Sequence, residues 1–288
     1  MKILSPAKIN LFLQINSKRS DGYHDLVSLM CCISLYDEIT LKCGTKRTEI
    51  RCSDPHVPQD KSNLAHQAGT IFLTHLKKSE GVNITIKKRI PVAAGLGGGS
   101  SNAASVLLGL NHYYGHPFST DQLMSMGLSL GADVPFFVFQ KPAIATGIGE
   151  KLEAYADLDP FTVLLIYPGF TISTSEIYRK LNLRLTKCKK KIKNTLLKKC
   201  GFDVTLHLCN DLETVTASAY PEIDLAKEQL LNFGALGALM SGSGPAVFGI
   251  FSDVEKAKNA RHALSHQIKW RLFLTDMIVD SGVSFEQT

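Results

Sequence analysis

The segment from residue 95 to residue 102 reads Gly-Leu-Gly-Gly-Gly-Ser-Ser-Asn. Glycine lets the backbone take a positive φ and removes the side chains that would keep an anion away. Successive backbone N–H groups followed by a helix N-terminus can bind phosphate oxygens, and the hydroxyls of Ser100 and Ser101 could add donors. This pattern predicts a phosphate site, although a glycine cluster by itself is as typical of a structural turn.

Two well-known phosphate-binding loops do not match this segment. A Walker A loop has Lys after its last glycine, and no Lys follows here. A dinucleotide-binding fingerprint that starts at Gly95 meets Ser100 where its third glycine belongs. The chain also has no H-R-D-type loop and no D-F-G triplet, which excludes a protein kinase. The glycines therefore indicate another kind of phosphate site.

Three further polar residues, Lys8, Asn10 and Asp133, are candidates for chemistry. Residues 7–15 alternate between aliphatic side chains and a second set that includes Lys8 and Asn10. A period of two predicts a half-buried strand, with Lys8 and Asn10 on one face about 7 Å apart. Asp133 lies in Gly-Ala-Asp-Val-Pro, just before an apolar run. Taken alone, Lys8 is a polar residue of a solvent-facing edge strand, and Asp133 is a turn residue that caps backbone.

The elements that must position these residues alternate irregularly, which predicts mixed α+β layers in two domains, 1–155 and 156–288. Ser62 is a plausible N-cap for the helix at 63–77, and Ser119 with Gln122 forms a capping box before the helix at 121–130, which Gly131 ends. The predicted strands are 7–15, 37–43 and 46–52 around a Gly44-Thr45 turn, 82–88, 161–167 and 246–251; the other predicted helices follow the glycine loop and lie near 175–181, 222–233 and 254–264.

Composition excludes several classes of protein. The 288 residues are 44% hydrophobic and 20% charged, which excludes a mainly disordered chain. No apolar run approaches the roughly 20 residues that span a bilayer, and the N-terminus does not resemble a signal or transit peptide, so we expect a soluble, cytoplasmic protein without membrane contact. The seven scattered cysteines form no zinc-type spacing, which favours free thiols in a reducing compartment.

The net charge of +6 is local. Residues 177–202 hold ten basic residues and no acidic one, so the rest of the chain, with 22 basic against 26 acidic residues, is −4. The lysine run at 187–199 lacks interleaved aromatics and matches no nucleic-acid motif, so we expect no specific nucleic-acid partner. It is typical of a solvated surface, or of a segment that raises the potential for polyanionic ligands.

Three segments together resemble the GHMP kinases, the small-molecule kinases of galactose, homoserine, mevalonate and phosphomevalonate. They are S-P-A-K-I-N-L-F-L at 5–13 followed by R-S-D-G-Y-H at 19–24, the stretch 90–104 around the glycines, and M-S-G-S-G-P-A-V-F at 240–248. The resemblance implies an α+β fold with an N-terminal domain like the second domain of ribosomal protein S5, a ferredoxin-like C-terminal domain and an active site in the cleft between them. It also implies ATP as the phosphate donor.

Within the family, the chain is most similar to the branch that phosphorylates the 2-hydroxyl of a cytidine-diphosphate-linked methylerythritol, in isopentenyl diphosphate synthesis by the non-mevalonate pathway. The motifs that together carry this resemblance are P-A-K-I-N-L-x-L, D-G-Y-H, G-L-G-G-G-S-S-N and L-G-A-D-V-P-F. The resemblance implies Asp133 as the base and Lys8 as its assistant. It implies a nucleotide site at Asn63, Leu64, Lys88, Pro91, Gly95, Leu96, Gly97, Gly98, Gly99, Ser100 and Ser101. It implies a substrate site at Asn10, Tyr23, His24, Thr174, Tyr178, Gly242 and Ser243.

Some expectations stay open at this point. Homoserine or mevalonate kinases of the same family are the alternative, and Tyr23, His24 and Tyr178 discriminate against them because only a nucleobase needs stacking rings. Tyr178 could equally be a packed core aromatic, and Gly242 with Ser243 could form only a tight turn. Mg²⁺ is implied by ATP chemistry, but no Glu stands where relatives place a ligand. The chain could be a monomer or a homodimer.

Overall fold

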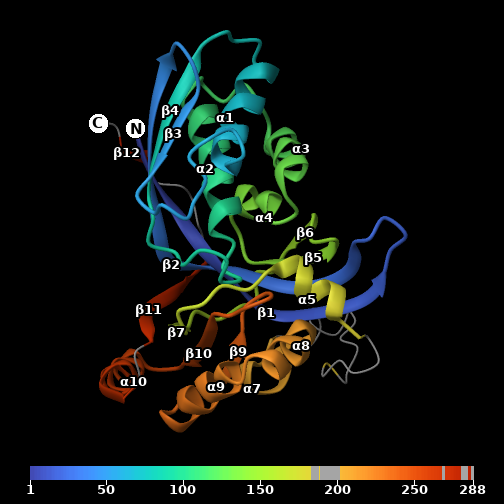
Figure 1. The fold of residues 1–288 in the computed structure, drawn as a ribbon, viewed down its shortest axis with the longest axis vertical. Coiled ribbons are helices and arrows are strands. Elements are labelled where there is room, and N and C mark those ends of the chain that lie inside the picture. Colours follow the sequence, from blue (N-terminus) through green and yellow to red (C-terminus); the bar gives the residue numbers. More distant parts are fainter. Residues whose placement is uncertain (183–187, 189–201, 268–269, 280–284, 287–288) are drawn as a thin grey trace.

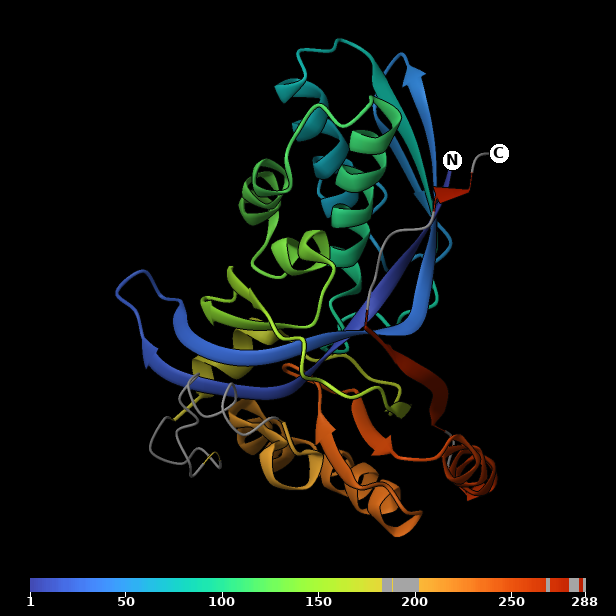
Figure 2. The same cartoon turned by 180° about the vertical axis from the view of Figure 1, so that it is seen from behind.

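The long strands β1 (Lys2–Lys18) and β2 (His24–Thr45) form an antiparallel hairpin that runs through the middle of the molecule (Figures 1 and 2). The computed structural model describes all residues except 183–187, 189–201, 268–269, 280–284 and 287–288. The lysine run therefore lies outside the described residues, apart from Cys188. Within the described part, no helix is both long and apolar enough to cross a membrane.

The N-terminal half has four helices between residues 64 and 139. They pack on one side of strands that extend from β2 (Figure 1). β4 pairs antiparallel with β2, β3 pairs parallel with β4, and β5 joins β2 to β6. The core between helices and strands is aliphatic, with Leu107 of α2 and Ile39 of β2 fully buried. The elements are β3 (Glu49–Cys52), α1 (Leu64–His75), β4 (Gly81–Lys87), α2 (Gly98–Tyr113), α3 (Thr120–Leu130), α4 (Val134–Phe139), β5 (Ala143–Gly147) and β6 (Lys151–Ala154).

The C-terminal half has a sheet of order β11-β7-β10-β9 in which every neighbouring pair is antiparallel. This is the ferredoxin-like order that the resemblance implies. β8 and β12 pair with β1, and β11 also pairs with β2, so the halves share one continuous sheet. The elements are β7 (Thr162–Tyr167), α5 (Thr174–Lys180), α7 (Val204–His207), β8 (Cys209–Asn210), α8 (Asp211–Ala219), α9 (Glu222–Asn232), β9 (Gly237–Met240), β10 (Val247–Phe251), α10 (Val254–Gln267), β11 (Arg271–Ile278) and β12 (Phe285–Glu286).

The two-domain α+β architecture is confirmed, and most predicted elements lie where expected. The prediction for 46–52 was wrong in its length and its partner, since β3 is shorter and β4 lies between it and β2. The N-cap of α1 is Asn63, whose side chain accepts the N–H of Ala65, and not Ser62. The capping box of Ser119 and Gln122 is present. The boundary between residues 155 and 156 stays a prediction.

Strand β1 is not the half-buried strand that its alternation predicts. Residues 7–15 are all buried, because α2, α8 and β8 pack against it. The register with β2 shifts between Asn10 and Phe12, so Leu11 is an extra, unpaired residue. Such a bulge reverses the alternation beyond it. Leu13, and not Phe12, therefore lies on the same cavity as Lys8 and Asn10.

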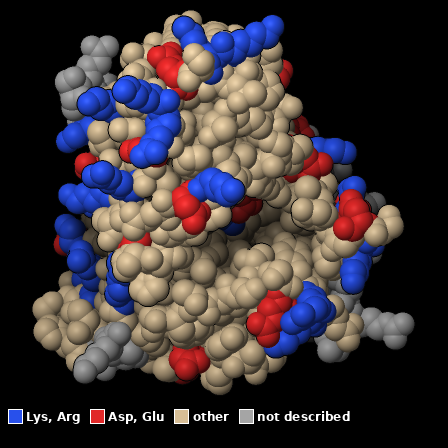
Figure 3. Space-filling model, turned by 45° about the horizontal axis from the view of Figure 1, so that its top comes forward, with Lys and Arg blue, Asp and Glu red and all other residues tan. Residues whose placement is uncertain are grey.

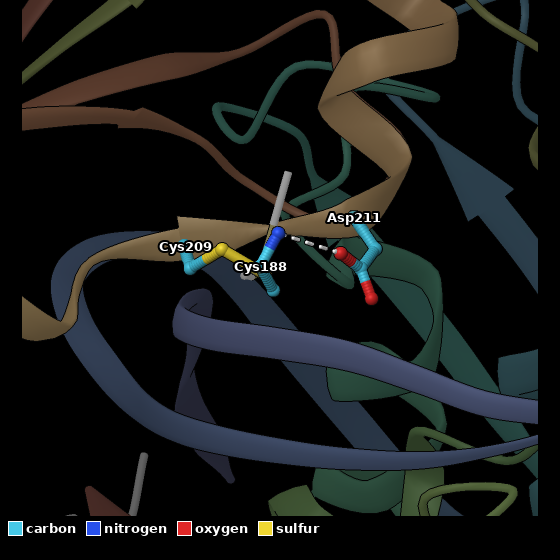
Figure 4. Close-up of side chains that lie close together, drawn as sticks. All are labelled: Cys188, Cys209 and Asp211. Atoms are coloured by element: carbon cyan, nitrogen blue, oxygen red, sulfur yellow. Dashed lines mark hydrogen bonds between the residues drawn. A yellow bond between two sulfur atoms is a disulfide. The ribbon is translucent and has the colours of Figure 1, made fainter. Parts of the chain in front are cut away.

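The expectation that all cysteines are free thiols was wrong for two of them. Cys188 and Cys209 form a disulfide, with Cα atoms 5.8 Å apart, which is within the range that a disulfide spans. Figure 4 shows the bridge beside Asp211, whose carboxylate accepts the N–H groups of Cys188 at 3.2 Å and Ile15 at 2.8 Å. A contact across 21 residues depends on the fold and leaves no signature in cysteine spacing.

We predict that reduction of this disulfide lowers the free energy of unfolding by about 3 kcal/mol, because a closed loop of this length restricts the unfolded chain. Urea unfolding with and without dithiothreitol measures the difference. The Cys209→Ser variant is the control, since the reductant should not change its unfolding midpoint. Equal midpoints for the oxidised and reduced native chain would contradict the prediction.

Candidate active site

A cavity of about 1010 Å³ lies between the two halves, and the face in Figure 3 is hollowed there. Every residue that the sequence assigned to a site lines this cavity, with the exception of Ser101. Ser101 is fully buried and its hydroxyl lies 2.8 Å from that of Ser5. Its hydroxyl is therefore used within the fold and does not reach the cavity.

The glycine loop ends directly in helix α2. Gly95 and Gly97 have φ of 78° and 69°, and Ala93 takes φ of 50° as well. Such positive values favour glycine. Gly97 is the N-cap of α2 and offers no side chain to accept the first N–H groups of the helix. Gly98, Gly99 and Ser100 line the cavity. The uncapped N-terminus of a 16-residue helix thus faces the cavity, where it favours an anion.

The glycine loop is held in place by the loop at 241–246 of the C-terminal half. The Ser241 hydroxyl donates to the Gly95 carbonyl at 3.0 Å, and the Ala246 N–H donates to the Ala94 carbonyl at 3.2 Å. A Cβ added at Gly95 would clash with the Ser241 carbonyl oxygen. This approach requires glycine, and it joins the two halves beside the N-terminus of α2.

Lys8 is oriented by a chain of hydrogen bonds along the hairpin. The Ser28 hydroxyl donates to the Phe12 carbonyl at 2.7 Å, so its oxygen is free to accept the Asn10 amide at 2.8 Å. The Asn10 carbonyl oxygen then accepts the Lys8 ammonium at 2.5 Å. The side chain of Lys8 is only 5% exposed, so these partners fix where its charge lies. Asn10 thus contacts Lys8 and fixes the position of its ammonium.

The structure brings Lys8 and Asp133 together across the cavity wall. The ammonium of Lys8 lies 3.8 Å from Oδ2 of Asp133, and the Asp133 side chain is 40% exposed. Asp133 occupies the N-cap position of α4 but makes no capping hydrogen bond with its side chain. The carboxylate is therefore available to a ligand, and the interpretation of Asp133 as a backbone cap does not hold.

Aromatic side chains gather in another part of the cavity lining. The rings of His24 and Tyr178 lie with their centroids 5.2 Å apart and their planes tilted by 39°, while Tyr23 is 57% exposed. Burial, and to a lesser extent the charge of Lys18, lowers the pKa of His24. Its imidazole is therefore neutral at pH 7 and offers one donor and one acceptor. Burial also raises the pKa of Tyr178, which keeps its hydroxyl protonated.

Small polar residues of the cavity lining also come together. The hydroxyls of Thr174 and Ser243 lie 2.8 Å apart, and Gly242 has φ of 56° beside Gly95. The Asn210 amide donates to the carbonyls of Met240 and Gly242 at 2.8 Å and 2.7 Å, and so braces this loop. Gly242 and Ser243 therefore form a tight turn, and the same turn borders the cavity.

The predicted nucleotide residues occupy the remaining wall, but two of their side chains are already engaged. Asn63 uses its carbonyl oxygen to cap α1 and its amide to bind the Pro58 carbonyl at 2.7 Å. Lys88 forms an ion pair with buried Asp37. Leu64 and Pro91 line the cavity directly. Asn63 can therefore meet a ligand mainly through its backbone.

Sequence reasoning missed Asp37, Ser28 and Asn210. Each is a buried polar residue whose partners come from distant parts of the chain. Buried polar groups need such partners, but the sequence shows no local signal for the pairing. Arg179 of α5, which also lines the cavity, was noted only as part of the basic segment.

Comparisons with known proteins agree with this arrangement. Residues 63–141 match the model for the GHMP kinases N terminal domain, and residues 197–269 match that for the GHMP kinases C terminal domain. The chain belongs to the GHMP kinase family and is a small-molecule kinase. GHMP kinases use ATP as the phosphate donor.

Individual relatives are similar over nearly the whole chain. The 4-diphosphocytidyl-2-C-methyl-D-erythritol kinase of Syntrophus aciditrophicus is 47% identical over 274 residues, which cover 95% of this chain and 98% of that protein. The protein of the same name from Syntrophotalea carbinolica is 45% identical, covering 96% and 99%. A crystal structure of 4-(cytidine 5'-diphospho)-2C-methyl-D-erythritol kinase has a TM-score of 0.79 at 33% identity, covering 96% and 99%. Homoserine kinase from Cytophaga hutchinsonii, 18% identical with a TM-score of 0.73 and covering 99% and 96%, shares the fold.

We predict that Gly95→Ala weakens ADP binding by about tenfold or more, equivalent to about 1.4 kcal/mol. The physical reason is that the new Cβ forces the glycine loop away from Ser241. Gly115→Ala is a matched control: its φ of 76° is nearly that of Gly95, but nothing lies within 4 Å of the added Cβ. Both variants should lose stability through the positive φ, but only Gly95→Ala should lose ADP affinity in isothermal titration. Equal affinities would refute the close-approach argument.

Proposed function

We propose that this protein transfers the γ-phosphate of ATP to the 2-hydroxyl of 4-(cytidine 5'-diphospho)-2-C-methyl-D-erythritol, within isopentenyl diphosphate synthesis by the non-mevalonate pathway. One observation carries the proposal: the anion-binding end of α2, the Lys8–Asp133 pair and the ring pair of His24 and Tyr178 share one cavity. The names of relatives that are 41–47% identical support the same substrate.

Asp133 acts as the base in this proposal. Phosphoryl transfer asks the protein mainly for positioning and charge stabilisation, and one group must take the proton of the attacking hydroxyl. Asp133 lies in the cavity with a carboxylate that is partly exposed and free of capping bonds. It accepts the proton of the 2-hydroxyl as the oxygen bonds to the γ-phosphorus, and ADP leaves with the former bridging oxygen.

Lys8 assists by charge. Its ammonium lies 3.8 Å from the Asp133 carboxylate and so places a positive charge beside the base. Its hydrogen bond to Asn10 uses one of its three protons, which leaves donors for the hydroxyl or the transferring phosphoryl group. Because the ammonium is nearly dehydrated by burial, its interaction with developing negative charge is stronger than at the surface.

The phosphates of ATP lie, in this proposal, against the N–H groups from Gly95 to Ser100, with Asn63, Leu64, Lys88 and Pro91 around the rest of the nucleotide. The N–H of Ser101 is donated to the Gly97 carbonyl within α2 and takes no part. Among the described residues that line the cavity, Asp133 supplies the only carboxylate. Mg²⁺ commonly takes one or two carboxylates together with phosphates and waters. Because Asp133 is assigned here as the base, the Ser100 hydroxyl would hold an ion carried on the phosphates, and the ion would neutralise part of their charge.

The cytidine group takes the aromatic part of the cavity. Tyr23 and Tyr178 offer stacking faces, and the neutral His24 imidazole offers a donor and an acceptor to the cytosine edge. Thr174, Gly242 and Ser243 contact the rest of the substrate in this proposal. We propose residues 1–155 as the ATP-binding domain and 156–288 as the C-terminal domain. A cytoplasmic location, no specific nucleic-acid partner and a monomeric or homodimeric state also stay predictions.

The reaction is tested with purified protein, ATP and the cytidine-diphosphate substrate, with mevalonate and homoserine as rival acceptors. We expect turnover of the first alone. Asp133→Asn should lower kcat by about 10²–10⁴, the usual contribution of a general base, and Lys8→Met should also lower it. Circular dichroism must show that both variants fold. Native kcat in Asp133→Asn would remove Asp133 as the base, and turnover of a rival acceptor alone would overturn the substrate.

The aromatic part of the cavity gives a second test. We predict that Tyr178→Ala raises the KM for the cytidine substrate by about tenfold or more, since stacking on a base contributes ~1–3 kcal/mol. The KM for ATP should stay unchanged, because the ring is proposed to contact the cytosine of the substrate and not ATP. Tyr113→Ala, at an exposed tyrosine in the last turn of α2, is the control. An unchanged substrate KM in Tyr178→Ala would favour an acceptor without a nucleobase.

A further inference from the structure

Asp37 is a buried carboxylate that lies behind the glycine loop and does not line the cavity. It is 0% exposed and accepts four hydrogen bonds. The donors are the Lys88 ammonium, the backbone N–H groups of Arg89 at 2.8 Å and Ile90 at 2.9 Å, and the Asn102 amide at 3.0 Å. A buried carboxylate is stable only with such partners, so this set of contacts is strongly defined.

The four donors come from the two segments that flank the glycine loop. Lys88, Arg89 and Ile90 precede the loop, and Asn102 lies in the first turns of α2. Asn102 also donates to the Ser5 hydroxyl at 3.0 Å, which extends the network to β1. One carboxylate on β2 therefore fixes the entry and the exit of the loop at once.

The same contact fixes the charge of Lys88. Its side chain is only 6% exposed, yet Lys88 belongs to the cavity lining. A Cβ added to Gly98, the first residue of α2, would lie 2.7 Å from its ammonium nitrogen. A cation at the positive end of a helix is unfavourable without a compensating anion. Asp37 supplies that anion in the free protein, and it keeps the ammonium where the phosphates of a nucleotide would lie.

We propose that Asp37 is a positioning residue for nucleotide binding: it holds the Lys88 ammonium against the start of α2, where Lys88 binds the phosphates of the nucleotide. The proposal rests on the proposed nucleotide site, and it moves Lys88 from the adenine and ribose to the phosphates. Asp37 acts through Lys88 and through the loop ends that it clamps, without touching the ligand.

The test compares the dissociation constants of ADP and adenosine by isothermal titration, since the two probes share base and ribose but differ in phosphates. We expect Lys88→Met to weaken ADP binding by about tenfold or more and to leave adenosine within about twofold, because hydrogen bonds to charged groups are the strong ones. Asp37→Asn should also weaken ADP selectively. When Asp37→Asn is added to Lys88→Met, the ratio of the dissociation constants of ADP and adenosine should change little.

The direction in which Asp37→Asn changes the affinity for ADP distinguishes a positioning role of Asp37 from a simple effect of its charge. Removal of a negative charge near a phosphate site would by itself tighten ADP binding, whereas loss of positioning weakens it. Asn111→Ala is the control for stability, because Asn111 is a buried polar residue on the same helix that binds the backbone of Phe118. It should leave both dissociation constants unchanged.

Three results would overturn the proposal: unchanged or tighter ADP binding in Asp37→Asn, equal weakening of ADP and adenosine in Lys88→Met, or the same selective loss in Asn111→Ala. If Asp37→Asn does not fold, Asn102→Ala removes another partner of the same carboxylate and takes its place. Failure of the native protein to bind ADP would instead contradict the proposed function, so the two failures are distinguishable.

Discussion

The contact between the glycine loop and the loop at 241–246 is the constraint on which the cavity depends. Two hydrogen bonds to the carbonyls of Ala94 and Gly95, from the Ala246 N–H and the Ser241 hydroxyl, join segments that belong to different halves of the chain. The approach leaves no room for a Cβ at Gly95. The uncapped N-terminus of α2 and the polar turn at Gly242 therefore share one wall, and neither half forms this wall alone.

The positive charges around that wall are held by partners within the fold. The ammonium of Lys8 is bound by Asn10 and that of Lys88 by Asp37, and both are almost fully buried. Asp133 differs, since its carboxylate is partly exposed and uncapped. Preorganised charges of this kind need little rearrangement when a ligand's charge develops beside them. Such an arrangement suits phosphoryl transfer, in which positioning and electrostatics do most of the catalysis.

The sequence predicts local features of this protein better than distant ones. The helix after the glycines, the capping box at Ser119 and the shared face of Lys8 and Asn10 depend on neighbouring residues, and each is present. The bulge at Leu11 and the Cys188–Cys209 bridge depend on how distant segments pack, so alternation and cysteine spacing gave wrong predictions. The convergence of Lys8 and Asp133 came from family motifs, because nothing in the residues between them indicates a meeting.

The bulge at Leu11 also determines where the chain can change its length. Upstream of it, Lys8 and Asn10 give the cavity polar lining, and downstream of it Leu13 gives apolar lining. A single strand therefore serves two chemically different parts of one cavity. Deleting or inserting one residue between 8 and 13 would turn one of these sets away, whereas the exposed hairpin tip around residues 19–22 contributes little packing. The segment between residues 8 and 13 therefore cannot change its length without the loss of one of these two linings.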